Sequence, residues 1–245
     1  MNEDNTIVAV NATVVQKKEK TVPKWQTDAK ERLRSSIKKY TKPLTDLCDR
    51  DANEGDTRLI VTDFLCEGFG YDKYSELTTE YRVKGEFADF GIRLDQQMVA
   101  FIEIKRVNTK LGDKQLRQVQ TYALNEGVEW VLLTNGHVWQ IYRITLGLPV
   151  ETHLVHEADL LSEQTPTQKI NSFFLFTREA IKRGLIQELW KARQATSPRA
   201  LIDILCSKSV LDSIRKEVRK KTGRNVDINE LLELLETTVF REGCK

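Results

Sequence analysis

The spacing of hydrophobic residues switches several times between a helical period and a strand period. Over residues 25–47, apolar side chains recur at every third or fourth position, which predicts a helix that Pro43 kinks or ends. A second helix is expected over residues 54–67, with an apolar stripe that includes Leu59 and Phe64. The glycine-rich stretch after it is a typical helix end.

Alternation with a period of two then predicts a run of strands. In the middle segment, Phe90 and Ile92 share one face, whereas Asp89 and Gly91 share the other. Turn-prone residues separate the segments, so we expect an antiparallel meander with one turn at residues 95–96. The three predicted strands cover residues 74–83, 86–94 and 97–105.

The second half of the core is predicted to continue with a crossover helix and more strands. Helical spacing returns over residues 112–126. Asn135-Gly136, between two runs of β-prone residues, predicts a hairpin with a type I′ turn, and a weaker strand is expected over residues 150–155. From about residue 160 onward every periodic segment is helical, and the predicted helices cover residues 168–183, 185–193, 198–206, 210–221 and 229–240.

This order of elements predicts an α/β fold, with a mixed central β-sheet flanked by helices and a helical C-terminal region. The chain has 245 residues, of which 40% are hydrophobic, enough for one sizeable core and a smaller appendage. We expect an N-terminal segment over residues 1–24, a core over residues 25–157 and the helical region over residues 158–245.

Charge and cysteine content limit the classes of function and the compartment that we expect for the protein. The formal net charge is only +2, so binding to nucleic acid must come from local clusters. Two basic segments, residues 17–42 and 208–224, are most simply solvated helix faces. The four cysteines form no C-x-x-C pair, and no apolar run is long enough to span a bilayer. These features predict a soluble cytoplasmic protein with no membrane partner, no disulfide framework and no zinc knuckle.

The residues best suited to catalysis lie at the end of the third predicted strand, in the stretch FIEIKR. Glu103 and Lys105 lie two residues apart, on the same face of a strand that is otherwise apolar. Burying a charge costs several kcal/mol unless it finds a partner or a metal, so the two residues form either a structural ion pair or a functional site.

A second carboxylate favours the functional site. Asp89 and Glu103 are about equally far from the turn at residues 95–96, so the hairpin brings them opposite each other. Two adjacent carboxylates repel unless they share a proton or a hard cation, and their oxygens suit Mg²⁺ or Mn²⁺ rather than zinc. Lys105 beside such a cation can orient or deprotonate a water molecule and stabilise developing negative charge, which is the chemistry of phosphodiester hydrolysis.

The arrangement of Asp89 with Glu103-Ile104-Lys105 resembles the D…E-x-K signature of the PD-(D/E)xK nuclease superfamily. Two further features agree: Glu54 opens the first core helix, and Gln118 and Tyr122 form a Q-x-x-x-Y pattern in the following helix. The stretch VEWVLLTNGHVWQIYR is similar to the strand pair after that helix in the N-terminal nuclease domain of type I restriction enzyme R subunits. The resemblance covers about residues 50 to 145. It departs from the superfamily's name in one place, because Ala88 stands where that name has proline.

The resemblance implies roles for these residues. Asp89 and Glu103 would be metal ligands together with the Ile104 carbonyl, Lys105 would activate water, and Glu54 would reach the metal or its waters. Gln118 and Tyr122, four residues apart on one helix face, would hold metal-bound groups or the nucleic-acid backbone.

Lys110, Lys114 and Arg117 follow the site and are candidates for phosphate contacts. His153 and His156 are not expected to form a metal site, because their spacing on a strand or loop does not make them converge.

The function expected from these residues is that of a Mg²⁺- or Mn²⁺-dependent deoxyribonuclease with a restriction-endonuclease-like fold, acting in restriction or in defence against foreign DNA. Two alternatives remain open. One is a module that binds nucleic acid without cleaving it. The other is a subunit of a larger restriction or defence complex, in which the helical C-terminal region binds other subunits or a second copy of the chain.

Overall fold

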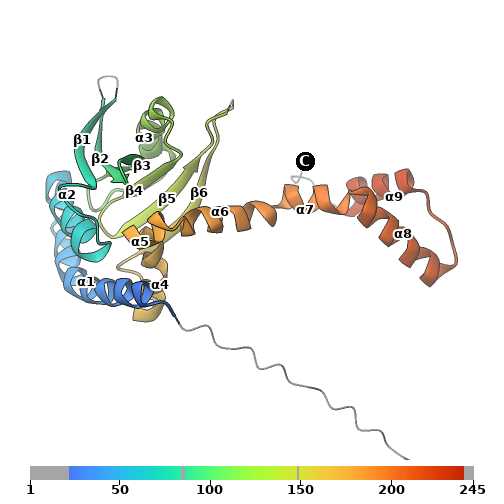
Figure 1. Ribbon diagram of the computed structural model, residues 1–245, viewed down its shortest axis with the longest axis horizontal. Helices are drawn as coiled ribbons and strands as arrows, with labels where there is room; N and C mark the ends of the chain where they lie inside the picture. Colours follow the sequence, from blue (N-terminus) through green and yellow to red (C-terminus); the bar gives the residue numbers. More distant parts are fainter. Residues whose placement is uncertain (1–21, 84–85, 148, 240–245) are drawn as a thin grey trace, which may run out of the picture.

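The central sheet contains six described strands in the order β1-β2-β3-β4-β5-β6. The structure is a computed structural model (Figure 1) that describes residues 22–83, 86–147 and 149–239, apart from the side chains at positions 80–83, 86, 87, 118 and 122. The strands are β1 (Leu77–Val83), β2 (Glu86–Leu94), β3 (Gln97–Ile104), β4 (Trp130–Thr134), β5 (Val138–Ile144) and β6 (Thr152–Asp159). β3 pairs with β4 in parallel and the other four pairings are antiparallel, which confirms the predicted mixed sheet. The N-terminal segment predicted over residues 1–24 lies almost wholly outside the described residues.

The β2–β3 hairpin turns at residues 95–96, as predicted. Both turn residues have positive φ, 48° and 67°, as a type I′ turn requires. The register between the two strands then shifts by one residue between Ile92 and Arg93. Beyond this β-bulge, Phe90 pairs with Ile102. The bulge therefore decides which residues of β3 lie opposite the part of β2 farthest from the turn.

The crossover between β3 and β4 is the helix α3 (Asp113–Glu126), close to its predicted bounds. Its buried residues Leu116, Val119 and Ala123 pack in one hydrophobic cluster with Phe101 of β3. A helix of this length lets the chain return to the end of the sheet at which β3 begins, so β4 can pair with β3 in parallel.

The β4–β5 hairpin is present, but its turn is not of type I′. Gly136 has a φ of 95°, whereas Asn135 does not have the positive φ that this turn type needs. The last strand pair before the loop is Thr134–Trp139. The Asn135 side chain accepts a hydrogen bond from the Val138 backbone N–H at 2.9 Å, which closes a wider loop. The Asn135 N–H also donates to the Val138 carbonyl at 3.3 Å, so one backbone and one side-chain hydrogen bond close the loop in place of the predicted turn at residues 135–136.

The face of the sheet opposite α3 is covered by α1 (Lys24–Asp49), α2 (Glu54–Asp63) and a π-helical turn, Phe64–Gly68. α1 runs through Pro43 to Asp49, so Pro43 does not end the helix. Pro43 is exposed, so the carbonyl that loses its hydrogen-bond donor can bind water instead.

The predicted apolar stripe of α2 is wrong at one position. Phe64 is buried, but Leu59 is 70% exposed. α2 instead meets the core through Thr57 and Val61. Helical spacing is consistent with either face, and the packing of α2 against the sheet selects the one that carries Thr57.

The predicted helix over residues 168–183 is divided into α4 (Pro166–Phe173), a 3-10 turn (Phe174–Phe176) and α5 (Arg178–Lys182). The break occurs because the Thr177 side chain caps α5 by accepting a hydrogen bond from the Ala180 N–H. The buried rings of Phe173 and Phe176, from this region, stack on Phe69, and Phe176 also meets Trp139 edge to face. α4 and α5 therefore share the hydrophobic core of the sheet.

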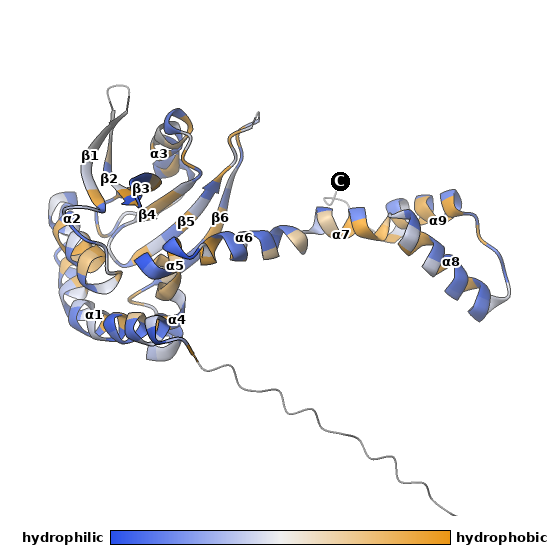
Figure 2. Cartoon of the chain, viewed as in Figure 1, coloured by the Kyte–Doolittle hydropathy of each residue, from blue (hydrophilic) through white to orange (hydrophobic). Residues whose placement is uncertain are grey.

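The remaining helices extend away from the sheet (Figure 1). They are α6 (Leu185–Ala195), α7 (Pro198–Leu205), α8 (Lys208–Thr222) and α9 (Ile228–Leu234), followed by a π-helical turn (Leu235–Val239). α7 has no buried residue, and Leu201 and Ile204 are 46% and 52% exposed. Figure 2 shows hydrophobic positions along α7 beside the strongly hydrophilic α8. None of the helices described here is long and apolar enough to cross a membrane.

Candidate active site

The candidate site lies at the end of β3, where β2 and the start of α2 approach it. The turn at residues 95–96 alone would place Asp89 opposite Ile102. The bulge moves the register by one residue, and continuing it from the Phe90–Ile102 pair places Asp89 opposite Glu103. Opposite residues of an antiparallel pair share a face, so the bulge brings the two carboxylates together.

Asp89 is buried and hydrogen-bonded to the backbone of the neighbouring strand. Its Oδ2 accepts a hydrogen bond from the Ile104 N–H at 2.7 Å. Its Oδ1 accepts a hydrogen bond from Nη2 of Arg58, on α2, in an ion pair. The side chain thus satisfies a buried amide of β3 and fixes its own orientation at the same time.

Glu103 and Lys105 form the ion pair expected from their spacing. Lys105 Nζ donates to Glu103 Oε1 at 2.6 Å. The Glu103 side chain is 3% exposed and that of Lys105 is 18% exposed. The second carboxylate oxygen of Glu103, Oε2, is buried and has no hydrogen-bond partner among the described atoms. A buried acceptor without a partner is costly, so this oxygen is placed to receive a ligand from the site.

The electrostatics of the pair are set mainly by burial. Burial raises the pKa of Glu103 to about 7; the Lys105 hydrogen bond opposes this shift, whereas the charges of Asp89 and Glu54 add to it. For Lys105, burial alone would lower the pKa, but the hydrogen bond and charge of Glu103 outweigh it and raise the pKa. Lys105 therefore stays cationic, while Glu103 changes charge near neutral pH.

Glu54 is the first residue of α2 and is exposed. Asn53 caps the helix by accepting a hydrogen bond from the Asp56 N–H at 2.9 Å, which fixes where α2 begins. The Glu54 charge acts on both Glu103 and Lys105. Glu54 thus lies near the site, at its solvent side, and its predicted role as a metal-side carboxylate stays a prediction.

Arg58 is the site residue that the sequence reasoning missed. It lies four residues after Glu54, which places both side chains on one face of α2. That spacing was visible in the sequence, but nothing in the sequence showed that this face of α2 meets Asp89. The guanidinium is partly exposed, whereas its Nε is buried and has no hydrogen-bond partner among the described atoms.

The segment after β3 is anchored to the α1–α2 turn. Arg106 forms an ion pair with Asp51, and Asn108 Nδ2 donates to Asp51 Oδ1 at 3.0 Å. Asp51 itself has a positive φ of 50°. These contacts hold the start of α2 against the end of β3, where Lys105 emerges.

Two groups of predicted site residues lie farther along the chain. The side chains of Gln118 and Tyr122 are outside the described part of the structure, although both positions lie within α3. Lys110, Lys114 and Arg117 are exposed on the loop after β3 and on the first turns of α3. Their exposure leaves them accessible for phosphate contacts, and those roles stay predictions.

The chemistry of the donor set fits a hard divalent cation. Asp89 and Glu103 supply carboxylate oxygens, one of them without a partner, and oxygen ligands are those that Mg²⁺ and Mn²⁺ prefer. Among the described residues, no three His, Cys, Asp or Glu side chains are grouped closely enough to hold a metal ion. A cation here would therefore rely on these two carboxylates, on backbone oxygen such as that of Ile104, and on water or substrate.

His153 and His156 belong to no group of three or more His, Cys, Asp or Glu side chains that could hold a metal ion among the described residues, and the expectation that they form no metal site stays a prediction. His156 Nε2 lies 2.7 Å from the Ser172 carbonyl oxygen, and His153 pairs with Glu151. Burial lowers the pKa of His156, which favours its neutral form. Each histidine therefore has a polar partner within the protein.

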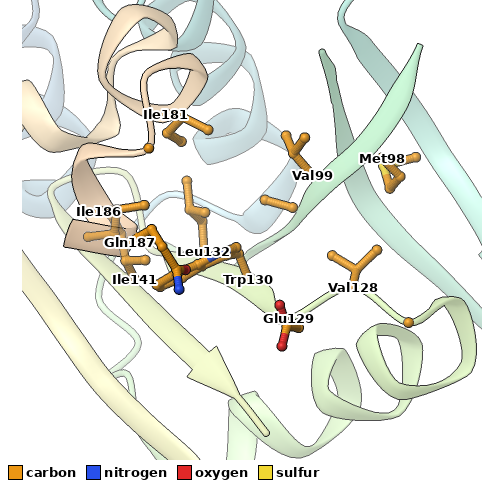
Figure 3. Close-up of a pocket in the computed structure, with 13 residues that line it drawn as sticks. Met98, Val99, Val128, Glu129, Trp130, Leu132, Ile141, Ile181, Ile186 and Gln187 are labelled. Carbon is orange, nitrogen blue, oxygen red and sulfur yellow. The ribbon is translucent and has the colours of Figure 1, made fainter. Parts of the chain in front are cut away.

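A separate pocket opens at the other end of β3. Figure 3 shows that it lies between the sheet and the α5–α6 region, with Met98 and Val99 on one side and Ile181 and Ile186 on the other. Its volume is about 270 Å³, and its lining is mainly apolar. The pocket is lined by none of the candidate site residues, so it has no part in the chemistry considered for Asp89 and Glu103.

The fold and site define a mixed α/β domain with two carboxylates and a lysine at the end of its central strands. Residues 53–151 match the family model described as the type I restriction enzyme R protein N terminus (HSDR_N). This stretch runs from the start of α2 through the β4–β5 hairpin, and it contains Glu54, Asp89, Glu103 and Lys105. The match supports a restriction-enzyme-like domain over these residues. No curated protein and no solved structure matches the chain.

Proposed function

We propose that the chain is a divalent-metal-dependent nuclease of the PD-(D/E)xK type that hydrolyses phosphodiester bonds of DNA in restriction or defence. The observation that carries the proposal is the buried, unpartnered Oε2 of Glu103, next to Asp89 and beside the cationic Lys105. Leaving that oxygen without a partner is costly in a purely structural ion pair, whereas a bound cation would satisfy it. The match of residues 53–151 to a restriction enzyme family supports the same function.

Each residue has a distinct task in this mechanism. Asp89 and Glu103 would hold Mg²⁺ or Mn²⁺, with the Ile104 carbonyl as a further oxygen ligand. When bound, the cation would offset the negative charge that develops on the phosphate. Lys105, whose Nζ lies 2.6 Å from Glu103 Oε1, would orient the attacking water and stabilise the same charge. The water oxygen would bond to phosphorus and give up a proton to solvent as the P–O bond to the leaving sugar oxygen breaks, and the leaving oxygen would take up a proton from solvent, so that the protons balance.

Plasmid cleavage by the purified protein in Mg²⁺, Mn²⁺ or EDTA tests the proposal. We expect cleavage that needs the metal and falls at least about 100-fold in Lys105→Ala. Lys182→Ala is a matched control, because Lys182 is an exposed lysine paired with Asp95 outside the site. Equal cleavage by wild type and Lys105→Ala would refute the assigned site, and no metal-dependent cleavage would favour the alternatives below.

A second candidate function is a role as a non-cleaving nucleic-acid-binding module or as a subunit of a larger restriction complex. The observation that favours it is the extended α6–α9 region, where α7 exposes Leu201 and Ile204 and the basic residues Arg215, Lys216 and Arg219 line a pocket on α8. Light scattering after size exclusion distinguishes a monomer from a homo-oligomer or a complex with other subunits. A monomer that cuts DNA by itself would exclude this candidate.

A further inference from the structure

We infer that Arg58 occupies, in the metal-free protein, the position from which a divalent cation must bind Asp89, and that it is released toward substrate phosphate when the cation binds. The inference rests on the proposed function, because it concerns the same two carboxylates. It assigns to α2 a positioning residue that exchanges between a protein carboxylate and an anionic ligand.

Both oxygens of the Asp89 carboxylate are engaged. The Ile104 N–H holds Oδ2 at 2.7 Å, and the Arg58 guanidinium holds Oδ1. A cation bound to Asp89 would meet the Arg58 charge directly at Oδ1. Two positive charges at one carboxylate oxygen repel each other strongly in a poorly solvated site. Arg58 and the cation therefore compete for Asp89.

The contact with Asp89 leaves one donor of Arg58 without a partner in the described part of the chain. Its Nε is buried without a hydrogen-bond partner among the described atoms, so the contact with Asp89 does not satisfy the whole guanidinium. A guanidinium presents Nε and Nη donors along one edge, a geometry that fits two oxygens of a phosphate. The same small region contains an acceptor without a partner, Oε2 of Glu103. The unused donor would bind the anionic ligand, and the unused acceptor would bind the cation. The two ligands together would therefore satisfy both groups.

Arg58 has room to move, whereas Asp89 does not. The Arg58 side chain is 37% exposed, and Asp89 is 9% exposed and bound to the β3 backbone. α2 is held in place by its Asn53 cap, so a change of side-chain rotamer is enough to release Asp89. Movement of the long side chain at the solvent edge leaves the strand pair intact.

Titration with Mn²⁺ alone, without DNA, tests the exchange by calorimetry on the full chain. Arg58→Gln removes the competing charge, and we expect it to bind Mn²⁺ about tenfold more tightly than wild type. In the absence of metal, Arg58→Gln should also melt at a lower temperature than wild type, and saturating Mn²⁺ should reduce this difference. Arg50→Gln is the matched control, because Arg50 pairs with Asp56 at the exposed start of α2 and contacts neither carboxylate.

The possible outcomes separate this inference from the proposed function. Equal or weaker Mn²⁺ binding by folded Arg58→Gln, with wild type binding normally, overturns the exchange and leaves the nuclease proposal standing. Tighter binding by Arg58→Gln in a protein that does not cut DNA supports the exchange and counts against the nuclease. Absence of Mn²⁺ binding in both proteins overturns the exchange and the metal-dependent nuclease together.

Discussion

The Asp89 carboxylate accepts a hydrogen bond from the Ile104 backbone N–H at 2.7 Å, so a side chain of β2 is bonded directly to the backbone of β3. This contact joins a candidate metal ligand to the residue between Glu103 and Lys105. It gives Asp89 a structural task in addition to its proposed chemical one, and the two tasks can be separated by substitution.

Asp89→Ala removes the acceptor and leaves a buried N–H without a partner, so it should reduce the free energy of unfolding by about 1–3 kcal/mol. Asp89→Asn keeps an acceptor oxygen for the Ile104 N–H and should cost less, although both variants lose metal binding. Urea denaturation of the two variants measures the difference. If Asp89→Ala were as stable as wild type, the hydrogen bond would contribute nothing to the free energy of unfolding.

The raised pKa of Glu103 predicts a pH-dependent stability in the metal-free protein. Its pKa is about 7 in the folded chain, against an ordinary glutamate value of 4.5, so the folded state binds the proton more tightly than the unfolded chain does. Proton binding by Glu103 therefore adds about 3 kcal/mol to the free energy of unfolding. This contribution is fully present below about pH 4.5 and is lost as the pH rises through 7.

Glu103→Gln is the matched control for this pH dependence. Urea denaturation at several pH values between 5 and 8 should show that the wild type loses more stability than Glu103→Gln as the pH rises. Addition of Mg²⁺ at pH 8 should restore part of the loss in the wild type alone. Identical pH profiles for the two proteins would contradict the assignment of the raised pKa to Glu103.

Gly136→Ala should disturb the contact between the β4–β5 loop and the helices that carry the site. Gly136 has a φ of 95°, and an added Cβ would lie 3.1 Å from Leu44 Cδ2 and 3.2 Å from Thr57 Cγ2. Because Thr57 precedes Arg58, a shift of α2 would also displace the guanidinium. We expect a loss of about 1–3 kcal/mol in urea denaturation.

The control for that substitution is Gly147→Ala, since the structure has nothing within 4 Å of the added Cβ. It should change stability by less than about 0.5 kcal/mol, as is usual for exposed positions. A similar loss in both alanine variants would show that the Gly136 contacts have no special effect.

Replacement of Lys110, Lys114 and Arg117 together by glutamine should weaken DNA binding and reduce its dependence on salt. Each lost phosphate contact lowers the slope of log affinity against log salt by about 0.9. Fluorescence anisotropy with labelled duplex DNA at several salt concentrations measures the slope. The same replacement at Arg215, Lys216 and Arg219 is the comparison, and a larger effect there would move the DNA-binding surface to α8.

Much of the fold follows from the sequence because hydrophobic period and turn chemistry are local properties. The β2–β3 turn at residues 95–96 and the α3 crossover were predicted close to their observed positions. The Asn135-Gly136 turn type was not, because the Asn135 side chain bonds to the Val138 N–H, a choice that residue type alone leaves open. The break between α4 and α5 likewise depends on how Thr177 caps and packs against the buried aromatic core.

The sequence by itself determined which residues of the site share a strand: alternation puts Glu103 and Lys105 on one face, and no long-range information is needed for that. The tertiary structure decided the rest. A one-residue bulge, rather than equal distance from the turn, sets Asp89 opposite Glu103, and the packing of α2 on the sheet brings Arg58 to Asp89. Register shifts and helix packing depend on the balance of contacts over the whole core, and the spacing of residues along the chain does not record that balance.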